Sequence, residues 1–241
     1  MPRRISSEET GGIRVGNANP LTFPGQIPEL LYKLSVDWVE LEVYLGNLVV
    51  DFLGTGTPDT IDFINKKLFG NSLRKLLKDV ADAKIVDPEA NTIFENVMLA
   101  IDGQAEIRNK ISHWRKQTSS VFPNAILLQE PKYIWYSKIL DQRYSDHITD
   151  ASVPNDQLSN FKNHAKETET NGTWVFFEED FRFYLQNIKL FRDAFFELMW
   201  WHRGGLPQYT QKDFLRDNFT DIERFSIDFS NYPIKPLESS T

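Results

Sequence analysis

The spacing of apolar residues predicts a chain built mainly of helices. Apolar side chains recur every three or four residues from Pro28 to about Phe52, which is the period of a helix that buries one face. Asp87 followed by Pro88 is typical of a helix start, because the aspartate caps the helix and the proline fits its first turn. The same period, interrupted by glycine and polar breaks, predicts further helices over about 59–68, 72–80, 88–114, 178–202 and 211–218.

Residues 115–177 do not keep the helical period. Ala125–Gln129 and Tyr133–Ser137 are short β-prone runs, and the segment Glu130-Pro131-Lys132 between them predicts a hairpin turn. Residues 173–177 predict a third strand, and the polar stretch 141–172 predicts a loop. The expected fold is therefore mainly α, a helical bundle with a small β insert before its last long helix.

The composition along the chain suggests three parts. Residues 1–27 are rich in Gly, Ser, Asn and Pro, so we expect a mobile or loosely packed N-terminal arm. Residues 28–205 form the expected helical domain, with the β and loop insert at about 115–177. Residues 206–241 are interpreted as a C-terminal extension with little pattern beyond one short helix.

Composition and charge narrow the possible functions. The chain is 41% apolar, contains no cysteine and carries a formal net charge of −7. Disulfides, thiolate nucleophiles and cysteine-bound zinc are therefore excluded, and a global field that attracts nucleic acid is absent. The first residues lack an apolar stretch, and no run approaches the ~18 apolar residues that span a membrane. We expect a cytoplasmic protein without a secretory signal.

The residue types most suited to chemistry gather between positions 106 and 116, where four basic side chains accompany one acidic side chain. On a helix that turns about 100° per residue, Ile107, Ile111 and Trp114 form the buried edge. Asn109 and His113 share an outward side, whereas Arg108 and His113 lie about 140° apart. One copy of the chain therefore does not easily direct both side chains at one phosphate, and a second copy packed antiparallel would supply the missing group.

The pattern Arg108-Asn109-x-x-x-His113 resembles the R-N-x-x-x-H motif of the HEPN superfamily of helical domains, many of which are metal-independent ribonucleases. The resemblance implies a homodimer with a composite site in the interface cleft. It gives catalytic roles to Arg108 and His113, with Asn109 in support, and it implies RNA as substrate without cofactor or metal. Members often act in toxin–antitoxin or antiviral systems, so an antagonist protein is a family-level expectation.

The remaining basic residues of the cluster, Lys110, Arg115 and Lys116, are predicted to bind RNA. The proposed chemistry suits these residue types, since histidine titrates near pH ~6.5 and can take a proton from a ribose 2′-OH. Arginine binds two phosphoryl oxygens in a fork. DNA lacks the attacking hydroxyl and would not be cleaved in this way.

Other interpretations of the same residues remain open. Basic side chains at a helix C-terminus also stabilise the negative end of the helix dipole, typically by ~0.3–1 kcal/mol each. The domain could then be a catalytically inactive HEPN-like module that binds a nucleotide, RNA or a partner protein. It could also be a structural protein whose heavy aromatic run over 176–201 is its interaction surface.

Overall fold

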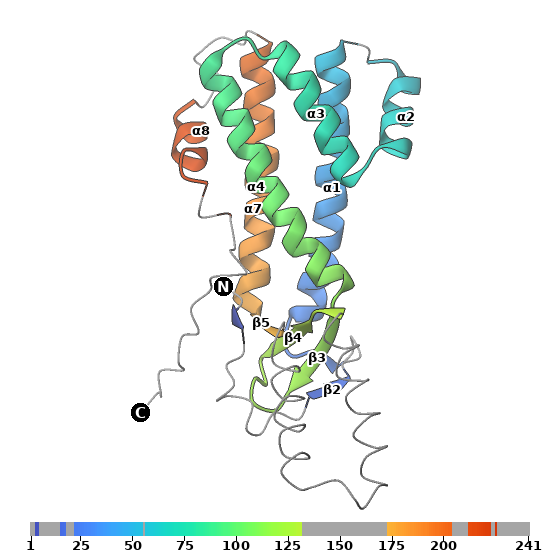
Figure 1. Cartoon of the computed structure of the whole chain (residues 1–241), viewed down its shortest axis with the longest axis vertical. Coiled ribbons are helices and arrows are strands. Elements are labelled where there is room, and N and C mark those ends of the chain that lie inside the picture. The colour runs from blue at the N-terminus through green and yellow to red at the C-terminus, as the bar shows by residue number, and fades with distance from the viewer. Residues whose placement is uncertain are drawn as a thin grey trace, which may run out of the picture. The chain divides into compact units, whose positions relative to one another are not determined.

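The structure is a computed structural model, and it describes residues 3–4, 15–17, 22–54, 56–131, 173–203, 212–222 and 225. Within these residues the fold is mainly helical with a small antiparallel sheet, which confirms the predicted fold class. The helices are α1 (Ile27–Leu53), α2 (Pro58–Lys67), α3 (Gly70–Lys84), α4 (Pro88–His113), α7 (Glu178–His202) and α8 (Lys212–Phe219). The strands are β1 (Arg3–Arg4), β2 (Val15–Asn17), β3 (Arg115–Ser119), β4 (Ala125–Gln129) and β5 (Thr173–Phe177) (Figure 1).

The chain divides into two compact units. We call Leu31–Ile107 with Arg182–Ile227 the helical unit, and Met1–Leu30, Arg108–Phe181 and Asp228–Thr241 the sheet unit. Helices α1, α4 and α7 each begin in one unit and end in the other. The last turns of α4, with most of the predicted site, therefore belong to the sheet unit.

Aromatic rings from three long helices meet in the core of the helical unit. Phe94 of α4 lies between Phe52 of α1 and Phe195 of α7, with ring centroids 6.4 and 6.3 Å apart. Trp38 of α1 and Phe191 of α7 are also fully buried. These residues occupy the apolar positions of the helical period, so the burial follows directly from the sequence pattern.

The segment after α7 completes this core. Asn96 Nδ2 of α4 donates to the carbonyl oxygen of Phe219 at 2.7 Å, and Gln104 Nε2 donates to that of Phe225 at 3.3 Å. The rings of Phe219 and Phe225 are stacked with centroids 5.6 Å apart, and both contact Phe191. Helix α8 is thus an integral part of the helical unit.

The helix ends follow local capping chemistry. Asp87 Oδ1 accepts from the backbone N–H of Glu89 at 2.9 Å and of Ala90 at 3.1 Å, as expected for an N-cap of α4. Thr57 caps α2, so this helix begins at Pro58, one residue before the predicted start at about residue 59. Gly54 ends α1 with φ of 66°, a left-handed conformation that a residue with a Cβ adopts only with strain.

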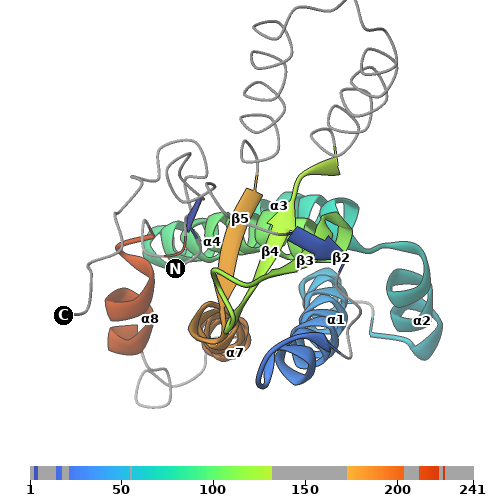
Figure 2. The ribbon, with the colours of Figure 1, turned by 90° about the horizontal axis from the view of Figure 1, so that it is seen from below.

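The sheet unit contains an antiparallel sheet with the strand order β1-β5-β4-β3-β2 (Figure 2). β4 and β5 match the strands that the sequence predicted, and their register pairs Leu127 with Val175. The predicted hairpin around residues 130–132 is wrong, because the neighbours of β4 are β3 and β5. The intended partner strand 133–137 and the loop 141–172 lie outside the described residues.

Two short strands come from the segment that the sequence interpreted as an arm. Residues 3–4 pair with β5 and residues 15–17 pair with β3, so both edges of the central strands are extended by the N-terminal segment. The sequence did not predict these strands, because the segment has neither alternation nor a run of β-prone residues. Among the described residues, no helix is both long and apolar enough to cross a lipid bilayer.

Candidate functional site at the end of helix α4

The predicted site residues lie where α4 ends and β3 begins. The backbone N–H of Trp114 donates to the carbonyl of Lys110 at 2.9 Å, which closes the last turn of the helix. The strand β3 starts at the next residue, Arg115. The basic cluster is therefore divided between a helix end and a strand, whereas the sequence predicted a helix to about Trp114 and no strand here.

The burial within the last turns of α4 agrees with the helical projection. Ile107 and Ile111 are 1% and 4% exposed, and Trp114 is partly buried. Asn109 and His113 are exposed, and Arg108 is partly exposed. The side chains with possible catalytic chemistry therefore face away from the core of this chain.

Arg108 and Asn109 are held together at the surface. Arg108 Nη1 donates to Asn109 Oδ1 at 3.1 Å. A guanidinium has five N–H donors, so this contact leaves most of them available to a phosphate. Asn109 thus orients Arg108, a contact between neighbouring residues that the sequence analysis did not foresee.

His113 lies farther along the same helix. Five residues separate it from Arg108, which on an ideal helix corresponds to about 7.5 Å along the axis and about 140° around it. In the part of the chain that the structure describes, His113 has no hydrogen-bond or ion-pair partner. The imidazole is thus accessible, and ideal helical geometry directs it away from the Arg108 guanidinium.

Lys110 and Trp114 form a second contact on the last turn. Lys110 Nζ lies 5.5 Å from the centroid of the Trp114 ring, a geometry that gives a cation–π attraction. The ammonium is thereby kept close to the helix end, and one face of the indole is occupied. Trp114, which the sequence places on the buried edge of the helix, is thus partly buried and in contact with Lys110.

Arg115 and Lys116 do not share one surface, because successive side chains of a strand point to opposite faces. Arg115 lies on the face of the sheet that carries Gln117 and Gln129, whose side chains share a buried hydrogen bond of 3.1 Å. Lys116 lies on the other face, and burial lowers the pKa of its ammonium. Arg115 and Lys116, which the sequence predicts in one RNA-binding surface, therefore lie on opposite faces of the sheet.

No group of three or more His, Cys, Asp or Glu side chains suited to a metal ion occurs among the described residues. His202 packs edge-on against Phe52 at 4.8 Å, and His147 and His164 lie outside the described residues. A surface pocket of about 520 Å³ in the helical unit contains none of the predicted site residues and is lined by Asn47, Val50, Asp51, Gly54, Gly56 and Ile61.

The helical unit contains a charged cluster that the sequence pattern does not predict. Asp102 of α4 accepts from Arg74 Nε and Lys78 Nζ of α3, both at 2.7 Å. The partners are separated by 28 and 24 positions in the chain, so no local spacing signals the contact. Asp102 pairs with both cations, which makes the cluster a structural clamp between α3 and α4.

The comparisons with protein-family models, with curated proteins and with solved structures found no match to this chain.

Proposed function

We propose that this protein is a metal-independent endoribonuclease of the HEPN type that acts as a homodimer. The observation that carries the proposal is the exposed His113 imidazole at the end of α4, without a partner among the described residues, on the same helix end as the Arg108–Asn109 pair. The residue types match the R-N-x-x-x-H motif, and the projecting side chains are the ones that the chemistry requires.

The proposed reaction uses the 2′-hydroxyl of RNA as nucleophile. The neutral His113 imidazole takes the proton of that hydroxyl, and the oxygen attacks the adjacent phosphorus. The Arg108 guanidinium binds the phosphoryl oxygens as negative charge builds up on them, and Asn109 holds the guanidinium in place. The bond to the 5′-oxygen breaks, and a protonated imidazole donates the proton to it. The products are a 2′,3′-cyclic phosphate and a 5′-hydroxyl.

Two copies of the chain are part of this proposal for a geometric reason. Arg108 and His113 diverge by about 140° around α4, so one copy offers an arginine and a histidine to different directions. A second copy that packs antiparallel near this surface supplies the complementary pair. One histidine then acts as base and the other as acid at a single phosphodiester.

The first test is cleavage of a labelled single-stranded RNA in the presence of chelator. We expect the His113→Ala variant to lose activity by about 10²–10⁴-fold, because it removes the acid–base group. Arg108→Ala should lose activity as well, and DNA of the same sequence should stay intact. Equal cleavage by the wild type and the His113→Ala variant would contradict the proposal.

The matched control is Ser112→Ala, since Ser112 is exposed on the same helical turn and has no assigned role in the chemistry. It should cleave RNA at the wild-type rate. Thermal unfolding followed by circular dichroism shows whether each variant keeps its fold. A loss of activity in Ser112→Ala would point to damage of the helix end rather than to a catalytic histidine.

A second candidate is an inactive HEPN-like module that binds a nucleotide, RNA or a partner protein. The hydrogen bond between Arg108 and Asn109 favours it, because it satisfies part of the guanidinium within the chain. Binding of RNA without cleavage, weakened by Arg108→Ala but not by His113→Ala, would support this role. In this case the basic cluster at the end of α4 binds RNA through its positive charge and performs no cleavage.

The cellular role that accompanies the nuclease proposal is toxin–antitoxin or antiviral defence in the cytoplasm, with an antagonist protein that restrains the activity. Expression of the wild type should then arrest growth, and expression of His113→Ala should not. Growth arrest by both proteins would show that the toxicity does not come from the proposed RNA cleavage.

A further inference from the structure

Helix α1 carries a stripe of apolar side chains on its outward face. Tyr32, Val36, Val39 and Val43 are 73%, 37%, 54% and 44% exposed, and they are separated by four, three and four residues. This is the heptad spacing of a helix that packs against another helix. We call these four residues the α1 stripe.

The opposite face of the same helix already forms the core. Leu34, Trp38, Leu41 and Leu45 are all at most 3% exposed. Helix α1 is therefore apolar on two opposite sides, although a surface helix needs only one apolar side. Single exposed apolar residues are common, but a continuous row at heptad spacing indicates a surface that another helix covers.

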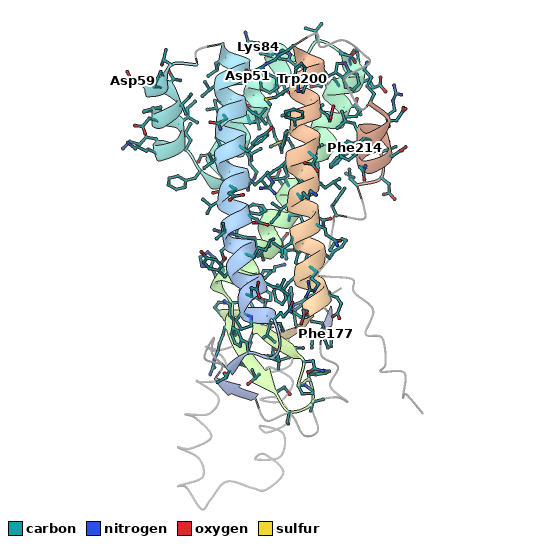
Figure 3. All side chains as sticks on the ribbon, turned by 180° about the vertical axis from the view of Figure 1, so that it is seen from behind. Asp51, Asp59, Lys84, Phe177, Trp200 and Phe214 are labelled. Atoms are coloured by element: carbon teal, nitrogen blue, oxygen red, sulfur yellow. The ribbon has the colours of Figure 1, made fainter. Side chains whose placement is uncertain are left out.

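Helix α7 runs beside α1 in the helical unit (Figure 3). Arg192 Nη1 of α7 donates to Glu40 Oε2 of α1 at 2.8 Å, which joins the two helices. Phe196 and Trp200 follow Arg192 by one and two helical turns, are 48% and 43% exposed, and contact each other edge-on. Apolar side chains are therefore exposed on both helices of this pair.

We propose that a second copy of this chain docks on the α1 stripe, with its own α1 running antiparallel. The spacing of four, three and four residues reads the same in both directions. An antiparallel pair therefore places Tyr32 against Val43 of the partner subunit, and Val36 against the partner's Val39, with every contact repeated by the two-fold axis. The heptad pattern is therefore continuous along the whole proposed pair.

The charges beside the α1 stripe fit the same pairing. Lys33 and Glu40 flank the stripe on one edge, and both are exposed. The Glu40 carboxylate already pairs with Arg192 through Oε2, and its other oxygen can accept from a further cation. In an antiparallel pair of helices, residues at this flanking position face the same position of the other helix, so Lys33 faces the partner's Glu40 and Glu40 faces the partner's Lys33. A parallel pair along the same seam would place Lys33 opposite Pro28 of the partner subunit and would lack this ion pair.

This interface does not depend on ribonuclease activity. Its residues belong to the helical unit, whereas Arg108 and His113 belong to the sheet unit. The α1 pairing can therefore be correct if the nuclease proposal fails, and the reverse also holds. The two proposals are separated by their variants, since Val39→Glu changes only the α1 stripe and is read out by assembly, whereas His113→Ala changes only the site on α4 and is read out by RNA cleavage.

The first experiment measures the mass of the full chain in solution by light scattering after size-exclusion chromatography. The wild type should be larger than one chain of 28.1 kDa. Val39→Glu places a charge in the centre of the stripe, so we expect its mass to fall to half of the wild-type value. The control is Val86→Glu, because Val86 is 90% exposed and lies outside the stripe.

Both variants change exposed valines, so their helix content should match the wild type by circular dichroism. A wild type that migrates as a single chain at micromolar concentration would overturn the proposal. The proposal would also fail if Val39→Glu kept the wild-type mass. If the stripe binds a different protein instead, the purified wild type would migrate as a single chain.

The second experiment tests the direction of the pairing, and it benefits from the absence of native cysteine. In an antiparallel pair, two copies of residue 32 are about 16 Å apart, because eleven residues separate the ends of the stripe at ~1.5 Å each. Tyr32→Cys alone should therefore form no disulfide dimer under mild oxidation. An equal mixture of the Tyr32→Cys and Val43→Cys proteins should form one. Rapid dimerisation of Tyr32→Cys alone would indicate parallel pairing and contradict the proposal.

Discussion

At the scale of single residues, Asp102 shows how a long-range contact fixes a helix in place. Its carboxylate receives one hydrogen bond from Arg74 and one from Lys78, each at 2.7 Å. The Arg74 side chain is only 11% exposed, so its positive charge is compensated by the Asp102 carboxylate more than by water. Loss of the carboxylate would leave a nearly buried guanidinium without compensation, which costs more than the loss of an exposed ion pair.

We predict that Asp102→Asn lowers the free energy of unfolding by about 1–3 kcal/mol, because the amide loses the negative charge and turns one of the two acceptor positions into an NH2 donor that faces a cation. Urea denaturation followed by circular dichroism measures the change. The matched control is Asp62→Asn, whose ion pair with Lys66 has side chains that are 59% and 69% exposed. The control should change stability by at most about 0.5 kcal/mol. Equal effects of the two substitutions would show that the clamp contributes no more than a surface pair.

The candidate site could be predicted only in part at this scale. Helical periodicity was enough to predict that Asn109 and His113 are exposed and that Ile107 and Ile111 are buried. It could not show that Arg115 and Lys116 face opposite sides, because that depends on a strand that begins directly after the helix. The prediction that these basic residues share one surface holds only if all of them belong to one helix.

At the scale of elements, the long helices were predictable because each buries one continuous apolar face. β4 and β5 were predictable as well, since both are runs of β-branched and large apolar residues. β3 was not, because its sequence Arg-Lys-Gln-Thr-Ser has no apolar residue. It forms a strand because β4, buried along its whole length, has backbone groups on both edges that require partners. This requirement arises from the tertiary structure, so the local sequence of β3 does not indicate a strand.

The start of α4 gives a prediction about one element. The hydrogen bond from the backbone N–H of Ala90 lowers the pKa of Asp87, and those from Glu89 and from Trp201 Nε1 act in the same direction. Asp87→Ala removes the cap and should lower the free energy of unfolding by about 1 kcal/mol at neutral pH. Chemical denaturation of the two proteins measures this difference.

The pH dependence of that difference follows from the direction of the shift. A carboxyl with a lower pKa in the folded chain adds stability above its ordinary value of 3.8 and loses it as the pH falls through the folded-state pKa. The gap between the wild type and Asp87→Ala should therefore close in acid. Asp87→Asn keeps an oxygen that can cap the helix without titrating, so its gap to Asp87→Ala should persist. A gap between wild type and Asp87→Ala that stays constant down to low pH would exclude the carboxylate as its source.

At the scale of the whole molecule, the parts of each unit come from distant segments of the chain. The sequence pattern predicts a helical domain that ends at residue 205, followed by an extension over 206–241. In the helical unit, however, Leu215, Phe219 and Phe225 are at most 1% exposed. The short amphipathic pattern over 211–218 predicted the helix, but not that its apolar side fills the core beside Phe191.

This arrangement predicts that the last part of the chain is required for stability. Phe219→Ala should lower the free energy of unfolding by about 3–5 kcal/mol, since it leaves a cavity between Phe191 and Phe225. The matched control is Phe63→Ala, because Phe63 is 59% exposed and its removal creates no cavity. A chain that ends after Arg203 loses every one of these contacts and should unfold at lower denaturant than Phe219→Ala, whereas a chain that ends after Phe225 retains them. If truncation after Arg203 left the unfolding transition unchanged, α8 would be an appendage rather than a part of the core.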